Sequence, residues 1–143
     1  MHSTKLFTSN SSEDTISLGE RVGKKLFPGA IVSLKGVLGS GKTVFTKGIA
    51  RGLKIKEEVL SPSFTLINEY EGKLKLYHLD MYRIDSEEEF KFLGVDDILY
   101  GNGVSVIEWG DKIEKALPED HISVLIEIKG DTSRILQIDG IEL

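Results

Sequence analysis

A glycine-rich turn between two apolar segments sets the strongest limit on how this chain can fold. The turn runs Gly36-Val37-Leu38-Gly39-Ser40-Gly41-Lys42-Thr43 and matches the phosphate-binding P-loop pattern G-x-x-x-x-G-K-[ST]. Glycine allows backbone conformations that are closed to residues with a Cβ atom, so successive N–H groups can converge on phosphate oxygens. The lysine adds a mobile positive charge, and the threonine hydroxyl is a hard oxygen ligand suited to Mg²⁺. The turn therefore predicts a nucleotide-phosphate site.

The segments on either side are those that such a site requires. Upstream, residues 30–34 form a short apolar, β-branched run that is typical of a buried strand. Downstream, Phe45, Ile49 and Leu53 recur every four residues, as on one face of a helix. A strand, a loop and a helix in this order aim the helix dipole and its free N–H groups at the phosphates. This context disfavours the alternative, a structural glycine turn with an incidental lysine.

Length and composition limit the class of protein. The 143 residues predict a single P-loop domain over residues 1–143, with no room for a separate substrate domain. There is no cysteine, which excludes disulfides and thiolate metal sites. No apolar run is long enough for a signal peptide or a membrane span, so we expect a cytoplasmic protein with no membrane contact. The net charge of −5 argues against a domain that binds nucleic acid by itself.

Hydrophobic patterns elsewhere predict an α/β fold. The expected elements are a strand at residues 5–8, a helix after Ser11 or Ser12, a hairpin turning at residues 71–73, a short helix capped by Ser86, a strand at 104–108, a short surface helix at 111–117 and a hairpin over 122–138. The first helix is expected to carry Ile16, Gly19, Val22 and Leu26 on its inner side. The glutamates at 87–89 complement the dipole of the helix that follows Ser86, which favours a structural role over a metal site.

Two acidic residues close apolar strands. Asp80 ends residues 74–80 and Glu108 ends residues 104–108, where a lone carboxylate is costly to bury without a partner. Open α/β sheets bind ligands beyond the carboxyl ends of their strands, so we expect Gly36, Asp80 and Glu108 to converge on one crevice. Asp80 is then suited to hold Mg²⁺, and Glu108 to orient an attacking water or complete the metal shell. For Asp80, a cap on the following turn is the alternative.

Four features near these strands have a structural as well as a functional interpretation. The Thr15 hydroxyl, in a first helical turn, usually satisfies a local backbone group. The hydroxyls of residues 61–65 are typical of turn chemistry. His78 is interpreted as a hydrogen-bonded structural histidine. Trp109, the only tryptophan, either covers the edge of the core or borders the site.

Several stretches together resemble the TsaE family of bacterial ATPases, also called YjeE, which are needed for threonylcarbamoyladenosine modification of tRNA. The resemblance covers nearly the whole chain. Besides the P-loop, it is carried by Thr15-Ile16-Ser17-Leu18-Gly19, Ser61-Pro62-Ser63-Phe64-Thr65-Leu66, Tyr77-His78-Leu79-Asp80-Met81-Tyr82-Arg83, Leu93-Gly94 and Ile107-Glu108-Trp109.

This resemblance implies a P-loop NTPase-like three-layer α/β fold with a mixed sheet, magnesium-dependent ATP binding and slow ATP hydrolysis. It also implies docking to the TsaB and TsaD proteins, with tRNA reached only through their complex. At matching positions it implies catalytic roles for Lys42, Asp80 and Glu108, Mg²⁺ binding by Thr43, Asp80 and Glu108, and nucleotide binding by Thr15, Gly39, Ser40, Gly41, Lys42, Thr43, Val44 and Arg134. Ser61, Pro62, Ser63, Phe64 and Thr65 would form a nucleotide-sensing switch, and Trp109 would lie at a partner contact or at the edge of the site.

Two positions depart from the family's usual pattern. Val37 stands where an acid is common and Val44 where a small hydroxyl residue is usual, but neither change removes a phosphate or magnesium group. The alternative function is a small-molecule P-loop kinase, although no insertion is long enough to build a substrate lid. A GTPase is disfavoured because the sequence has no N-K-x-D tetrad. A third class, a binding module that uses ATP only for folding, predicts that Glu108→Ala leaves function unchanged.

Overall fold

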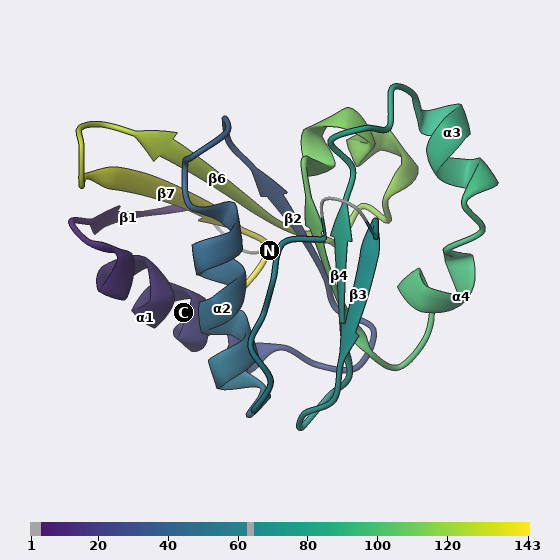
Figure 1. Cartoon of the computed structure of the whole chain (residues 1–143), viewed down its shortest axis with the longest axis horizontal. Coiled ribbons are helices and arrows are strands. Elements are labelled where there is room, and N and C mark those ends of the chain that lie inside the picture. Colours follow the sequence, from purple (N-terminus) through teal and green to yellow (C-terminus); the bar gives the residue numbers. More distant parts are fainter. Residues whose placement is uncertain (1–3, 63–64) are drawn as a thin grey trace.

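The computed structural model describes residues 4–62 and 65–143, and the strands in these ranges form one mixed sheet. The strands are β1 (Lys5–Ser9), β2 (Ile31–Lys35), β3 (Ile67–Tyr70), β4 (Leu76–Asp80), β5 (Val104–Glu108), β6 (Ile122–Ile128) and β7 (Arg134–Asp139). They lie side by side in the order β1-β7-β6-β2-β5-β4-β3 (Figure 1). The pairs β2–β5, β2–β6 and β4–β5 are parallel, and the outer pairs are antiparallel.

Helices cover both faces of the sheet. One face is covered by α1 (Ser12–Lys25) and α2 (Lys42–Gly52). The other face is covered by α3 (Glu87–Phe92), α4 (Asp96–Leu99) and the 3₁₀ turns η1 (Gly110–Lys112) and η2 (Glu114–Ala116). Successive side chains of a strand point to opposite faces. In β2, Val32 and Leu34 therefore join the core with α1 and α2, whereas Ile31 joins the core with α3 and α4. The predicted three-layer α/β fold with a mixed sheet is confirmed.

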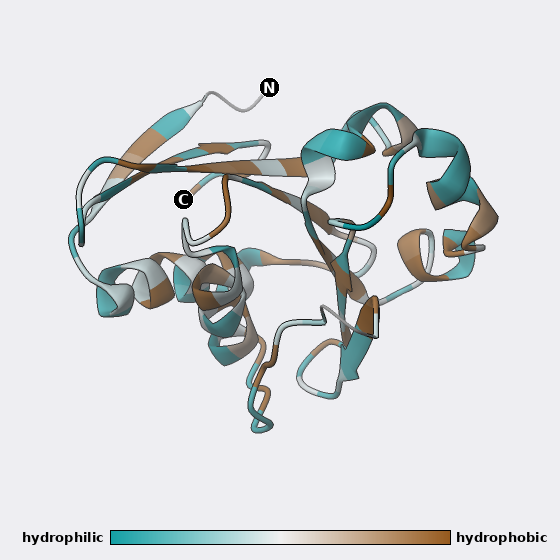
Figure 2. Ribbon diagram, turned by 45° about the horizontal axis from the view of Figure 1, so that its top comes forward, coloured by the Kyte–Doolittle hydropathy of each residue, from teal (hydrophilic) through white to brown (hydrophobic). Residues whose placement is uncertain are grey.

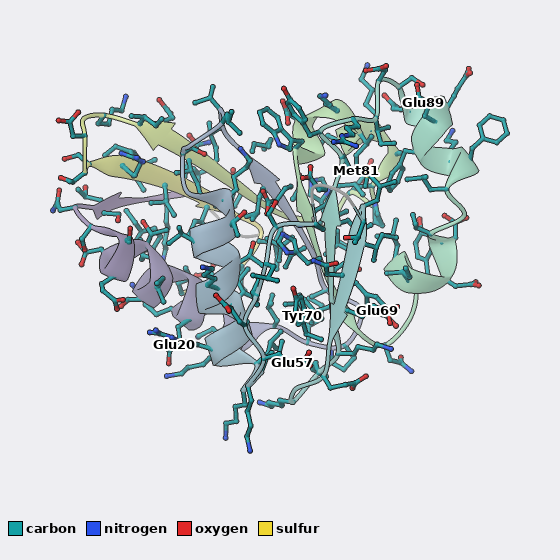
Figure 3. All side chains as sticks on the ribbon, in the orientation of Figure 1. Glu20, Glu57, Glu69, Tyr70, Met81 and Glu89 are labelled. Atoms are coloured by element: carbon teal, nitrogen blue, oxygen red, sulfur yellow. The ribbon has the colours of Figure 1, made fainter. Side chains whose placement is uncertain are left out.

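The hydrophobic pattern follows these layers. Hydrophobic residues concentrate along the strands, while hydrophilic residues predominate on α3 (Figure 2). Tyr70 at the end of β3 is buried in the first core, the one with α1 and α2. Met81 follows β4 and is buried in the second core, the one with α3 and α4 (Figure 3). No helix in the described part of the chain combines the length and the apolarity needed to cross a membrane.

The predicted helix caps are present. The Ser11 hydroxyl accepts a hydrogen bond from the Asp14 amide at 3.0 Å and begins α1. The Ser86 hydroxyl does the same for the Glu89 amide at 3.2 Å and begins α3. Each side chain satisfies a backbone donor that lacks a partner within its helix.

Two local predictions are wrong. The surface helix predicted at residues 111–117 consists instead of the turns η1 and η2, and Ile113 between them is fully buried. This segment belongs to the second core because Ile113 packs there. Of the residues predicted to face inward from α1, Gly19, Val22 and Leu26 are buried, but Ile16 is only partly buried and Leu18 is buried instead.

Glycines bring α1 and α2 into close contact. Gly19 and Gly23 of α1 face Gly48 and Gly52 of α2. A Cβ atom added at Gly48 would lie 2.9 Å from the Cα atom of Gly19 and even closer to a backbone oxygen of α1. There is no space for side chains at this crossing, so the two backbones pack directly. Because α2 begins at Lys42, this contact holds the helix that follows the P-loop.

Candidate functional site

A cleft of about 450 Å³ opens where β4 and β5 end, beside the N-terminus of α2. It brings together side chains from segments that are far apart in the sequence. The lining residues are Leu38, Gly39, Gly41, Lys42, Thr43, Val44, Ser61, Leu66, Asp80, Tyr82, Arg83, Glu108 and Trp109.

The P-loop leaves the start of α2 open to an anion. Gly41 caps α2 in a left-handed conformation with φ 111°, which a residue with a Cβ atom rarely adopts. Among the described residues, no side chain caps α2 and no acid lies in its first turn. By contrast, α1 has both a serine cap and acidic residues at its start. The N-terminal N–H groups of α2 are therefore available to a negatively charged ligand.

Lys42 lies across this loop and is almost completely buried. Its ammonium group donates to the carbonyl oxygens of Gly36 at 2.7 Å and Val37 at 3.1 Å. Burial lowers the pKa of Lys42, while the negative charges of Glu108, Asp111 and Asp80 oppose this shift. A bound phosphate would act in the same direction as these acids and stabilise the charged form of the lysine.

Trp109 borders the cleft above this ammonium group. Its ring centroid lies 4.0 Å from Lys42 Nζ and 4.9 Å from the ring centroid of Tyr82. The backbone of Trp109 is left-handed, with φ 62°, which directs the chain sharply away from the end of β5. The ring also packs against the second core. Both interpretations of this residue therefore hold: it covers the core edge and it borders the site.

The acidic residues approach the P-loop because of strand register. Asp80 and Glu108 are paired across the parallel strands β4 and β5. In β4 and in β5, a side chain that packs in the core with α2 lies an even number of residues before the acid. Successive side chains of a strand alternate between its two faces, so both acids point to the face that α2 covers. Glu108 Oε2 accepts a hydrogen bond from Thr43 Oγ1 at 3.0 Å. The cleft thus combines the P-loop threonine with an acid from the end of a distant strand.

Asp80 caps a turn as well as lining the cleft. Its Oδ1 atom accepts a hydrogen bond from the Tyr82 amide at 2.9 Å. The two interpretations of Asp80 are compatible, because this bond uses only one of the carboxylate oxygens. Gly36 does not line the cleft itself; it contributes the carbonyl that accepts from Lys42.

The donor set at this position suits Mg²⁺. Thr43, Asp80 and Glu108 offer hydroxyl and carboxylate oxygens, the ligands that this hard cation prefers. Within residues 4–62 and 65–143, no group of three or more His, Asp or Glu side chains forms a complete metal site. Mg²⁺ commonly takes one or two protein ligands and completes its shell with water and substrate phosphates. The residues present therefore fit a metal shared with a phosphate ligand.

A second, smaller hollow of about 190 Å³ lies beside the P-loop. Its lining residues are Ser11, Ser12, Thr15, Gly39, Ser40, Gly41, Val44, Asp131, Thr132 and Arg134. The structure thus brings Thr15, Val44 and Arg134 together with the P-loop glycines. The Thr15 hydroxyl is buried, and it lies 2.7 Å from the Ser9 hydroxyl. Its partner is therefore a side chain of β1 and not a backbone group of its own helix.

Arg134 supports the P-loop backbone. Its Nε atom donates to the Ser40 carbonyl at 3.0 Å, and a terminal nitrogen lies 3.4 Å from the Gly39 carbonyl. The other terminal nitrogen donates to the carbonyls of Gly130 and Ser133 in the β6–β7 turn. Arg134 therefore links this turn to the phosphate-binding loop.

The predicted switch segment is only partly described. Ser63 and Phe64 lie outside the described residues. Ser61 lines the cleft, whereas Pro62 is buried and its carbonyl accepts from the Leu66 amide at 2.9 Å. The Thr65 hydroxyl donates to Asn68 Oδ1 at 2.7 Å. Ser61 is thus the described residue of this segment that lines the cleft.

Some cleft residues were not predicted as site residues. Tyr82 and Arg83 line the cleft because the chain turns back over it directly after Asp80. Their position immediately after an acid at a strand end is the signal that could have identified them. Leu38 at the tip of the P-loop is also a lining residue and is 79% exposed. Leu38 occupies a variable position of the P-loop pattern, so the pattern does not identify it as a site residue.

The chain is similar to known proteins over most of its length. A family model described as "Threonylcarbamoyl adenosine biosynthesis protein TsaE" matches residues 9–136, a range that includes every lining residue of both hollows. A Treponema pallidum protein named tRNA threonylcarbamoyladenosine biosynthesis protein TsaE is 44% identical over 130 residues, covering 91% of this chain and 96% of that relative. A Bacillus subtilis protein of the same name is 43% identical over 123 residues, covering 85% of this chain and 77% of that relative.

A solved structure is also similar. The crystal structure of Bacillus subtilis YdiB superposes with a TM-score of 0.85 at 35% sequence identity. The superposition covers 99% of this chain and 88% of that chain. The similarity therefore includes the sheet, both helical layers and the segments that form the cleft.

Proposed function

The chain belongs to the TsaE family of threonylcarbamoyl adenosine biosynthesis proteins, and we propose that it binds ATP with Mg²⁺ and hydrolyses the ATP slowly. The family is involved in tRNA threonylcarbamoyladenosine biosynthesis. The observation that carries the proposal is the 3.0 Å contact between Thr43 Oγ1 and Glu108 Oε2 in the cleft that Lys42 also lines. This contact joins the P-loop hydroxyl to an acid, as a nucleotide-bound metal site requires.

Each residue has a distinct task in this proposal. The N–H groups of the P-loop and of the first turn of α2 bind phosphate oxygens, and Lys42 neutralises their charge. Thr43 and the carboxylates of Asp80 and Glu108 hold Mg²⁺, directly or through water. When bound, the metal would polarise the phosphate and stabilise the charge that develops on its oxygens. Glu108 is also suited to orient the attacking water, because a carboxylate accepts its hydrogen bond.

The second hollow is proposed to hold the nucleoside part of ATP. It shares Gly39, Gly41 and Val44 with the first, so one ligand can occupy both sides of the P-loop. Thr15 would contact the nucleotide near its base. Arg134 would act mainly by holding the loop carbonyls, since its guanidinium group already donates to the backbone of Ser40.

We propose TsaB and TsaD as the partners of this chain, with tRNA reached only through their complex. The cleft rim supports a protein partner, because it carries exposed apolar side chains. Val37, Leu38 and Tyr82 are 62%, 79% and 54% exposed. Apolar side chains gathered at one place on a surface often mark a protein contact. Val37 would then contribute to this contact where an acid is common in the family.

The proposal is tested by measuring nucleotide binding and phosphate release together. Calorimetry should detect Mg²⁺-dependent binding of ATP in preference to GTP, and single-turnover assays should show slow phosphate release that rises when TsaB and TsaD are added. No stimulation by the two proteins would refute the partnership. Transfer of phosphate to a metabolite, with none released into solution, would favour a small-molecule kinase instead.

Arg134→Met is expected to weaken ATP binding about tenfold, because it removes the hydrogen bond from a charged group to the Ser40 carbonyl, a bond worth about 1.5–3 kcal/mol. Only part of that energy should appear in binding, since water can replace the guanidinium group. Calorimetric titration measures the change. Lys129→Met is the control, because Lys129 is exposed and its side chain contacts only Glu127 of the same hairpin among the described residues. Equal affinities for both variants would contradict a role for Arg134 in supporting the loop.

A further inference from the structure

His78 is a buried polar residue that the proposed mechanism does not yet use. It lies in the middle of β4 and has no exposed surface. Its neighbours in the strand pairing are Val106 of β5 and Asn68 of β3, and Leu76 precedes it on the same face. A leucine would suit this largely apolar position. The imidazole ring therefore needs a reason other than packing, because burying a polar group costs free energy unless it is hydrogen-bonded.

The ring contacts the acid at the end of the neighbouring strand. His78 Nε2 lies 2.5 Å from Glu108 Oε2, and both side chains are almost completely buried. The same oxygen accepts the Thr43 hydroxyl at 3.0 Å. Both hydrogen bonds described for this carboxylate therefore involve Oε2, and Oε1 takes part in neither.

Geometry selects one form of the imidazole. His78 Nδ1 is buried and has no hydrogen-bond partner within the described part of the chain. If the single N–H of a neutral ring were on Nδ1, a buried donor would have no acceptor, and the Nε2 lone pair would face a carboxylate oxygen. With the N–H on Nε2, the ring donates to Glu108 and only an acceptor is left without a partner. The Nε2–H form is the one that fits the contact.

We propose that His78 is a positioning residue that orients the carboxylate of Glu108. The terminal torsion of a glutamate is broad, so a carboxylate held by one weak contact can rotate. The short bond from Nε2 holds Oε2 against the side of the cleft nearest β4, and this leaves Oε1 to receive a hydrogen bond from water or to bind the metal. The inference rests on the role proposed above for Glu108 in ATP hydrolysis.

Two substitutions at His78 separate hydrogen bonding from packing. His78→Leu fills the apolar position without a donor, whereas His78→Gln places an amide N–H near the position of Nε2. We expect His78→Leu to lower kcat for Mg²⁺-dependent ATP hydrolysis about 10- to 100-fold, the usual effect of removing an outer-shell partner. ATP affinity should change by less than about threefold, because His78 is not among the residues that line the cleft. His78→Gln should recover most of the lost rate.

A second measurement does not depend on activity. A ¹⁵N-resolved NMR spectrum of the nucleotide-free protein should contain imidazole signals from its three histidines, and the signals missing in His78→Gln would identify His78. We expect its Nε2 to be protonated and its Nδ1 to be unprotonated, with the Nε2 proton signal shifted by Glu108→Gln. Thermal unfolding of each variant confirms that it is folded.

The outcomes distinguish the alternatives. Equal rates for the wild type and His78→Leu would overturn the proposal, as would equal losses in His78→Leu and His78→Gln or a proton on Nδ1. If the wild-type protein released no phosphate from ATP, the proposed function would fail; the NMR result would then decide by itself whether His78 holds Glu108.

Discussion

Gly48→Ala is expected to lower the free energy of unfolding by about 3 kcal/mol, because overpacking at a close backbone contact forces the two elements apart. The added Cβ atom would clash with the Ile16 carbonyl oxygen and lie 2.9 Å from the Cα atom of Gly19. Both are backbone atoms, so no side-chain rotation can relieve the contact. Helix propensity alone predicts the opposite sign, since alanine in a helix interior is favoured over glycine by about 1 kcal/mol. Urea denaturation measures the change.

Gly130→Ala is the matched control for this substitution. Gly130 lies in the β6–β7 turn, and a Cβ atom there would have Ser133 Cβ as its nearest neighbour at 3.7 Å, an ordinary contact distance. We expect its free energy of unfolding to stay within about 0.5 kcal/mol of the wild-type value. If Gly48→Ala were equally neutral, the direct packing of α1 on α2 would be refuted.

Glu108→Gln is expected to reduce the rate of ATP hydrolysis at least about 100-fold, the lower range for loss of a general base or a metal-binding carboxylate. The amide keeps the shape of the side chain and can still accept a hydrogen bond from Thr43, but it has no negative charge for Mg²⁺ or for the proton of an attacking water. ATP binding should persist, because the P-loop amides and the Lys42 side chain stay in place. Single-turnover phosphate release measures the rate, and calorimetry measures the affinity.

Asp111→Asn provides the control for charge. Burial lowers the pKa of Lys42, and Glu108, Asp111 and Asp80 raise it in that order of importance. Both substitutions therefore let the pKa of Lys42 fall further, but Asp111 does not line the cleft. Hydrolysis by Asp111→Asn should stay within about threefold of the wild-type rate. An equal loss in the two variants would indicate that Glu108 acts through the lysine charge, and wild-type function of Glu108→Ala in cells would favour a binding module.

Local patterns predicted most of the elements and the centre of the site. The P-loop requires glycine at positions that leave the usual conformational regions, so a short stretch of sequence identifies both the turn and its ligand class. Strand-end acids are recognisable for a similar reason: a carboxylate after an apolar run needs a partner. Asp80 and Glu108 were found in this way, and the structure brings both to the cleft with Thr43. The prediction of a surface helix at 111–117 was wrong because Ile113 is buried in the second core, against residues that are far away in the sequence.

The phosphate-binding turn, the α/β class and the acids that end their strands could be predicted from the amino-acid sequence, because each depends on residues that are close together in the chain. Which atoms meet across the sheet depends instead on how the elements pack in three dimensions. Strand order pairs Asp80 with Glu108, the β6–β7 hairpin carries Arg134 to the P-loop, and the parallel register sets His78 against Glu108 Oε2. The backbone contact between α1 and α2 likewise depends on glycines that lie far apart in sequence. These contacts depend on strand order and helix crossing, which no local periodicity encodes.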